Sequence, residues 1–164
     1  MAIMGSSRPN KPLGKGRVFD PIRNGFVAAT AEELVRQALL QQMVGSLGFP
    51  KQLIAVEKDL RSLPHLAGEA IVLPERRADI ICFAKDIHPQ YPLYPLLLIE
   101  CKECVLNSQA EEQLLGYNTY VKAYFVALAS RTEVRLGYFD REAESYQFIS
   151  FLPTYAQLME KVRV

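Results

Sequence analysis

The sequence predicts an α/β domain built around a mixed central sheet with helices packed against it. Three observations support this prediction: apolar runs of strand length, longer stretches with helical periodicity, and the order in which the two kinds alternate. The order is a helix, three strands, a second helix, further strands and a short closing helix. We expect the helices to cover a sheet whose central strands are apolar.

Length and composition fit a single ordinary domain. The chain has 164 residues, of which 49% are hydrophobic, and a formal net charge of +1. A charge this close to zero argues against nucleic-acid binding over the whole surface, but it allows a local basic groove. No apolar run approaches the ~20 residues of a membrane span, and the N-terminus lacks the apolar core of a signal peptide. The three cysteines form an odd set, which fits a reducing compartment. We therefore expect a cytoplasmic protein without membrane contact.

Residues 1–28 are predicted to form an N-terminal arm, and residues 29–164 the domain itself. The arm is rich in turn residues, and its apolar segment 18–22 could dock on the domain. Its basic side chains could follow a phosphate backbone, although a solvated terminus is the simpler alternative. These basic residues are Arg8, Lys11, Lys15, Arg17 and Arg23.

The first helix is predicted to begin at Thr30 and to run to Leu47. Thr30 and Glu33 have the spacing of a capping box, and apolar residues recur at helical intervals after them. Gly48 and Pro50 end the helix. A first strand follows over residues 53–60.

Two further strands are predicted over residues 78–83 and 95–102, because both segments are almost wholly apolar. Three prolines between them exclude regular structure there. The remaining elements are a helix from Ser108, capped with Glu111, to about Lys122; strands over 123–129, 133–140 and 146–151; and a closing helix with Pro153 in its first turn that extends through Met159.

The candidate site lies on the two apolar strands. Alternate side chains of a strand share a face, so Glu100 and Lys102 point together and Cys101 points to the opposite side. If the two strands are neighbours, Asp79 stands beside this pair. Burying such charges is costly unless they pair or bind a metal. Asp79 alone could equally cap a turn, and Glu100 with Lys102 could form a structural ion pair.

This constellation suits hydrolysis of a phosphodiester assisted by a divalent metal. Mg²⁺ prefers oxygen ligands and is often held by only one or two carboxylates. Asp79 and Glu100 supply such a pair, the backbone carbonyl of Cys101 could be a further ligand, and Mn²⁺ could substitute for Mg²⁺. Lys102 could hold the attacking water or stabilise developing negative charge.

The motifs resemble the PD-(D/E)XK nuclease superfamily. Asp79 and the segment Glu100-Cys101-Lys102 carry this resemblance, and Gln113-x-x-x-Tyr117 adds a helical motif of its RecB-like members. Further segments occur in the order found in the N-terminal nuclease domain of type I restriction enzyme R subunits, and the chain is most similar to small stand-alone proteins with that domain. These segments are residues 19–23, 32–37, 54–57 and 77–80, and the similarity covers roughly residues 17–153.

The resemblance implies a restriction-endonuclease-like fold and a Mg²⁺-dependent endonuclease that hydrolyses DNA. Asp79 and Glu100 would bind the metal, and Lys102 would be catalytic. Glu33 would be a supporting acidic residue near the metal, although its capping-box position gives it a purely structural alternative.

The resemblance also implies roles for Gln113 and Tyr117, which share a helix face and would orient the substrate or the active-site groups. Arg76 and Arg77 are candidates for phosphate contacts. Gln113 and Tyr117 could instead simply pack their helix on the sheet.

Some features of the restriction subunits are absent from this sequence. No G-x-x-x-x-G-K-[ST] loop and no evident DNA-recognition domain are present, and Ala78 replaces the proline that precedes the aspartate in the superfamily. A protein partner would therefore have to supply sequence specificity or translocation. The alternative function is a catalytically inactive nuclease-fold module that binds nucleic acid or a protein partner.

Cys101-x-x-Cys104 could suggest a zinc or redox site. A single cysteine pair is too few for a structural zinc site, and no histidine spacing completes it. We expect Cys101 and Cys82 to be core residues.

Overall fold

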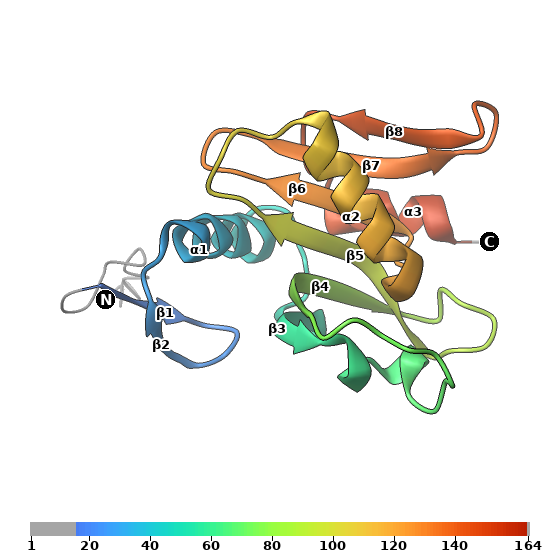
Figure 1. The fold of residues 1–164 in the computed structure, drawn as a ribbon, viewed down its shortest axis with the longest axis horizontal. Coiled ribbons are helices and arrows are strands. Elements are labelled where there is room, and N and C mark those ends of the chain that lie inside the picture. Colours follow the sequence, from blue (N-terminus) through green and yellow to red (C-terminus); the bar gives the residue numbers. More distant parts are fainter. Residues whose placement is uncertain (1–15, 164) are drawn as a thin grey trace, which may run out of the picture.

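The computed structural model describes residues 16–163, which form three α-helices and two sheets (Figure 1). The helices are α1 (Ala31–Gly45), α2 (Ser108–Val121) and α3 (Tyr155–Val162). The strands are β1 (Arg17–Asp20), β2 (Gly25–Ala28), β3 (Ile54–Asp59), β4 (Arg77–Lys85), β5 (Leu93–Cys101), β6 (Phe125–Ala129), β7 (Val134–Asp140) and β8 (Ser145–Ile149). Within this described part of the chain, no helix is long and apolar enough to cross a membrane.

The main sheet has six strands in the order β3-β4-β5-β6-β7-β8, and β1 and β2 form a separate hairpin. All neighbouring strands are antiparallel except β5 and β6, which run parallel. A parallel pair needs a crossover connection, and α2 supplies it between these two strands. The predicted mixed central sheet flanked by helices, the architecture of a restriction-endonuclease-like fold, is therefore confirmed.

The helices cover both faces of the sheet. α1 and α3 pack on one face, and α2 packs on the other (Figure 1). The central strands β4, β5 and β6 are consequently buried on both sides and read as almost continuous apolar runs. Charged residues on such strands are exceptions, and Asp79 and Glu100 are the two buried carboxylates on them.

The two faces carry two separate cores. Cys82, Ile99 and Cys101 belong to the core under α1, whereas Leu98 and Leu128 belong to the core under α2. The predicted burial of Cys82 and Cys101 is confirmed. Because β5 alternates, Glu100 lies on the same side as Leu98 and points toward α2.

The elements expected from the sequence are all present, but two helix starts differ. α2 is capped by Asn107, whose side chain accepts from the backbone N–H of Ala110, rather than by Ser108. With Asn107 as the cap, the N3 position of a capping box falls on Ala110, so Glu111 lies one residue too far along, and its carboxylate accepts from Arg135. Asparagine is a stronger cap than most residues, and here it lies one position before the expected serine.

α3 also starts later than expected. Thr154 and Gln157 form a full capping box, so Pro153 precedes the cap and does not lie in the first helical turn.

Residues 17–28 of the expected arm form the β1–β2 hairpin. Val18 and Asp20 are fully buried, and Ile22 packs against the core under α1. Segment 18–22 therefore docks on the domain as expected. The basic residues Arg8, Lys11 and Lys15 lie outside the described residues.

Candidate functional site

The site begins where the β4–β5 ladder ends. The last paired residues are Ile80 and Ile99, and beyond them the Asp79 carboxylate accepts from the backbone N–H of Cys101 at 2.8 Å. This side chain satisfies a buried donor that the ladder has left free. Asp79 is thereby fixed at the point where the two strands part.

The side chain of Glu100 lies on the face of β5 opposite to that of Cys101, beneath α2. Its Oε2 atom accepts from Arg76 at 3.1 Å, and the Arg76 guanidinium lies 4.2 Å from the centre of the Tyr117 ring. Among residues 16–163, the other oxygen of Glu100 and the hydroxyl of Tyr117 are both buried and have no hydrogen-bond partner. Buried polar atoms are almost always paired, so these two atoms mark where a water molecule or a ligand could bind.

The two carboxyl groups influence each other directly. Burial raises the pKa of Glu100 from its ordinary value of 4.5 to about 7, and the nearby negative charge of Asp79 adds to the shift. The positive charges of Arg76 and Lys102 oppose it without cancelling it. The folded protein therefore disfavours a second negative charge next to Asp79.

Lys102 directly follows β5 and is half-buried. Its backbone N–H donates to the carbonyl of Ala129 at 2.8 Å, which extends the pairing with β6. Its charge acts on Glu100 and also on Glu32 of α1. Within residues 16–163 its ammonium has no ion-pair partner within 4.0 Å. The lysine is therefore available to a substrate.

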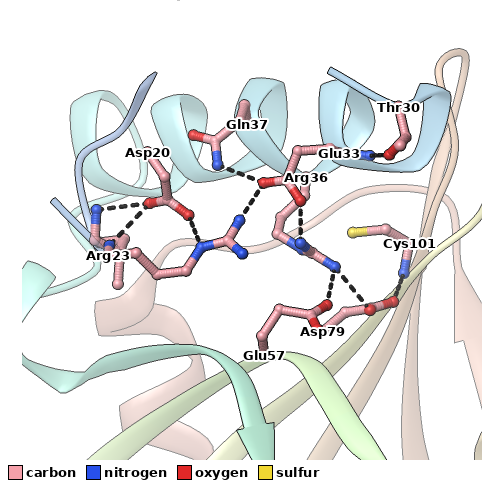
Figure 2. A network of polar contacts seen from close by, with 10 residues as sticks. Asp20, Arg23, Thr30, Glu33, Arg36, Gln37, Glu57, Asp79 and Cys101 are labelled. Atoms are coloured by element: carbon pink, nitrogen blue, oxygen red, sulfur yellow. Dashed lines mark hydrogen bonds and ion pairs between the residues drawn. The ribbon is translucent and has the colours of Figure 1, made fainter. Parts of the chain in front are cut away.

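A buried arginine connects α1 to Asp79 (Figure 2). Arg36 is only 3% exposed, and its Nη2 atom lies 3.0 Å from the second oxygen of Asp79 and also contacts Glu57 of β3. Its Nη1 atom donates to Glu33, one turn earlier on the same helix. One guanidinium thus forms ion pairs with carboxylates from three different elements.

The same network reaches the hairpin. Glu33 also accepts from Arg23 and Gln37, and Arg23, which lies in the β1–β2 turn, donates to Asp20 at the end of β1 (Figure 2). Asp20 additionally accepts from two backbone N–H groups of that turn. An unbroken series of charged contacts therefore runs from the hairpin to Asp79.

Glu57 occupies an unusual backbone conformation, with a φ of 53°. Such left-handed values are disfavoured for residues with a β-carbon. Glu57 stands between two β3–β4 pairs, Val56 with Ile80 and Lys58 with Ala78. Its side chain contacts Arg36, so the local strain lies next to the site.

A comparison with models of protein families matches residues 31–153 to the type I restriction enzyme R protein N terminus. The chain belongs to this family. The match confirms the resemblance expected from the motifs and includes Asp79, Glu100 and Lys102. Comparisons with curated proteins and with solved structures gave no match.

The structure brings some of the expected family residues together and separates others. Asp79, Glu100 and Tyr117 meet at one end of β5, with Lys102 beside them. Gln113, one turn before Tyr117, is exposed and makes no hydrogen bond or ion pair with the acidic residues in the described part of the chain. Arg77 is also exposed, and the preceding residue, Arg76, is the one that binds Glu100.

A second acidic residue of α1, Glu32, is also influenced by the charge of Asp79. Burial and the nearby charge of Asp79 raise the pKa of Glu32, and both Arg36 and Lys102 oppose the shift. Glu33 is instead surrounded by Arg23, Arg36 and Gln37. Its observed contacts give it a positioning role through Arg36, and its expected contribution to a metal stays a prediction.

The cysteines of Cys101-x-x-Cys104 do not face one another across a site. Cys101 is buried and Cys104 is exposed, and burial raises the pKa of the Cys101 thiol. Only the backbone carbonyl of Cys101 is thus suited to metal binding at neutral pH. In the region covering residues 16–163, no three side chains of the His, Cys, Asp and Glu types are arranged to hold a metal by themselves.

We expect Arg36→Met to destabilise the domain by about 3–5 kcal/mol, because it leaves three carboxylates without their shared cation. Urea unfolding measures this change. The control is Arg61→Met, which removes an exposed ion pair with Asp59 and should leave the unfolding midpoint unchanged. Equal effects of both substitutions would contradict the assigned role of Arg36.

The raised pKa of Glu100 makes a pH-dependent prediction for the metal-free protein. Between pH 4.5 and about 7 the unfolded chain releases a proton that the folded chain retains, so this group lowers stability as the pH rises. In a chelating buffer, Glu100→Gln should be more stable than the wild type by roughly 3 kcal/mol at about pH 8 and no different at about pH 4. Thermal unfolding with Glu112→Gln, an exposed residue of α2, as the control checks this expectation.

Proposed function

We propose that this domain is a metal-dependent nuclease that hydrolyses phosphodiester bonds in DNA. One observation carries the proposal: two buried carboxyl groups lie close together, one oxygen of Glu100 has no hydrogen-bond partner among the described residues, and the neighbouring Lys102 has no ion-pair partner among them. A charge arrangement of this kind is costly to the fold, and a function would explain its presence.

The residues present fit Mg²⁺. Glu100 has a buried oxygen without a partner, and the Tyr117 hydroxyl beside it is also unpaired. Asp79, Glu100 and the carbonyl of Cys101 would supply oxygen ligands, with water and phosphate oxygens completing the shell, as Mg²⁺ usually requires. Mn²⁺ accepts the same ligands.

Each chain residue would then have a defined task. A divalent cation in this place would neutralise phosphate charge and lower the pKa of water. Asp79 would remain oriented by the N–H of Cys101 and by Arg36. Lys102, on the same face as Glu100, would hydrogen-bond to the attacking water or to the phosphate oxygens as charge develops on them. Tyr117 would orient the substrate through its unpaired hydroxyl.

We infer that DNA is the substrate because the family is defined on the R protein of type I restriction enzymes. A protein partner would supply sequence specificity or translocation. Arg77 and Gln113 remain proposed substrate contacts, since both are exposed near the start of β4 and on α2. A cytoplasmic location also stays a prediction.

One observation favours a second function. Both oxygens of Asp79 already accept from protein groups, one from Arg36 and one from Cys101. Each carboxylate oxygen retains a second lone pair, so metal binding is still open, but the aspartate is satisfied without it. A nuclease-fold module that binds nucleic acid or a protein partner without cleaving DNA is therefore the alternative.

We expect the purified protein to cleave single- or double-stranded DNA when Mg²⁺ or Mn²⁺ is added. Asp79→Ala and Lys102→Ala should each reduce the cleavage rate by at least about 100-fold, because each removes a group used in the transition state. Gel assays measure this change. The same cleavage in both variants would assign the activity to a contaminant and reject the site, and DNA binding without any cleavage would support the alternative module.

Calorimetric titration should detect Mn²⁺ binding to the wild type and a loss of affinity of at least about tenfold in Glu100→Gln, which keeps the shape of the side chain but removes the charged oxygen pair. Glu112→Gln serves as the matched control because it changes an exposed glutamate of α2. Indistinguishable titrations of the wild type and Glu100→Gln would exclude Glu100 as a ligand.

A further inference from the structure

Arg76 occupies a distinctive position above the acidic pair. Its guanidinium donates to Glu100 and rests on the face of the Tyr117 ring, while its side chain remains 43% exposed. Its backbone carbonyl accepts from the N–H of Leu60 at 3.3 Å, which fixes the residue just before β4. One edge of the guanidinium thus contacts Glu100, and the rest of the group is open to solvent.

The ion pair with Glu100 would compete with a bound cation. Without metal, Arg76 is the positive group that contacts the otherwise unpaired Glu100 directly. Once a divalent cation neutralises Glu100, the arginine is no longer needed as its counter-ion. The stacking on Tyr117 would keep the guanidinium over the site, because this contact involves the ring face and not the carboxylate.

We propose that Arg76 is a substrate-binding residue that exchanges Glu100 for a DNA phosphate when a divalent cation occupies the site. A planar guanidinium that is stacked on one face and free along its edge is suited to hold phosphate oxygens through paired N–H donors. This inference rests on the proposed nuclease function and adds a residue that couples metal binding to substrate binding.

The neighbouring arginine provides a contrast. Arg77 begins β4 opposite Asp59. It is exposed and carries the same charge one residue away, but it makes no hydrogen bond or ion pair with Glu100 among the described residues. In the Mn²⁺ titration, Arg77→Ala therefore controls for the loss of one positive charge near the site.

The proposal predicts effects of opposite sign for two ligands. In the absence of DNA, removal of Arg76 takes away a competitor for Glu100, so Mn²⁺ should bind more tightly. In the presence of a cation, the same change removes a phosphate contact, so DNA should bind more weakly. An arginine that only supports the fold would weaken both or affect neither.

The experiment compares the wild type, Arg76→Ala, Arg76→Lys and Arg77→Ala. Calorimetry with Mn²⁺ should show about threefold or more tighter binding for Arg76→Ala and little change for Arg77→Ala. Fluorescence anisotropy with labelled DNA and Ca²⁺, used as a cation that limits cleavage, should show about tenfold weaker binding for Arg76→Ala. The salt slope should fall by about one for that variant.

Arg76→Lys retains the charge but loses the stacked planar donor, so we expect nearly wild-type Mn²⁺ affinity and intermediate DNA affinity. Thermal unfolding of each variant confirms that the domain is folded. With EDTA in place of Ca²⁺, Arg76→Ala should bind DNA about as tightly as the wild type, because Arg76 then stays on Glu100.

The outcomes separate the two proposals. If the wild type binds Mn²⁺ and DNA but Arg76→Ala binds DNA as tightly as the wild type does, the phosphate role of Arg76 is rejected and the nuclease site stands. If Arg76→Ala weakens Mn²⁺ binding, the arginine supports the fold and the exchange is also rejected. If the wild type binds neither ligand, the proposed function fails and the exchange fails with it.

Discussion

The fold around the site depends on one buried guanidinium. Arg36 brings together carboxylates of α1, β3 and β4 that would otherwise repel one another in a region with little water. Isolated buried charges cost several kcal/mol each, so this cation stabilises the close approach of α1 to the strands. The hairpin depends on it as well, because Arg23 and Arg36 share Glu33.

The charge balance differs between the two faces of the sheet, and this difference defines the site. Under α1, the carboxylates of Asp79, Glu57 and Glu33 are all paired with arginine. Under α2, Glu100 has one partly exposed arginine and one oxygen without any partner. The side facing α2 is therefore where a buried carboxylate oxygen is left for an external cation to coordinate.

Strand periodicity explains why part of the site could be predicted from the sequence. Alternation alone placed Glu100 opposite Cys101, and neighbouring apolar runs placed Asp79 near them. Arg36 could not be found this way, because its partners lie as many as 43 residues along the chain from it. The different surroundings of Glu32 and Glu33 could not be predicted in this way either. Both residues stand in the first turn of α1, and only the tertiary arginines distinguish them. Arg76 precedes β4, so strand alternation does not describe its direction.

The two carboxylates carry different information about function. Asp79 satisfies the N–H of Cys101 where the β4–β5 ladder ends and pairs with Arg36, so the fold benefits from it whether or not a metal binds. Glu100 does not have this compensation: burial raises its pKa to about 7, and one of its oxygens is unpaired. A chain without metal chemistry would be more stable with a neutral residue there. The presence of Glu100, more than that of Asp79, is thus the feature that favours an active metal site over an inert module.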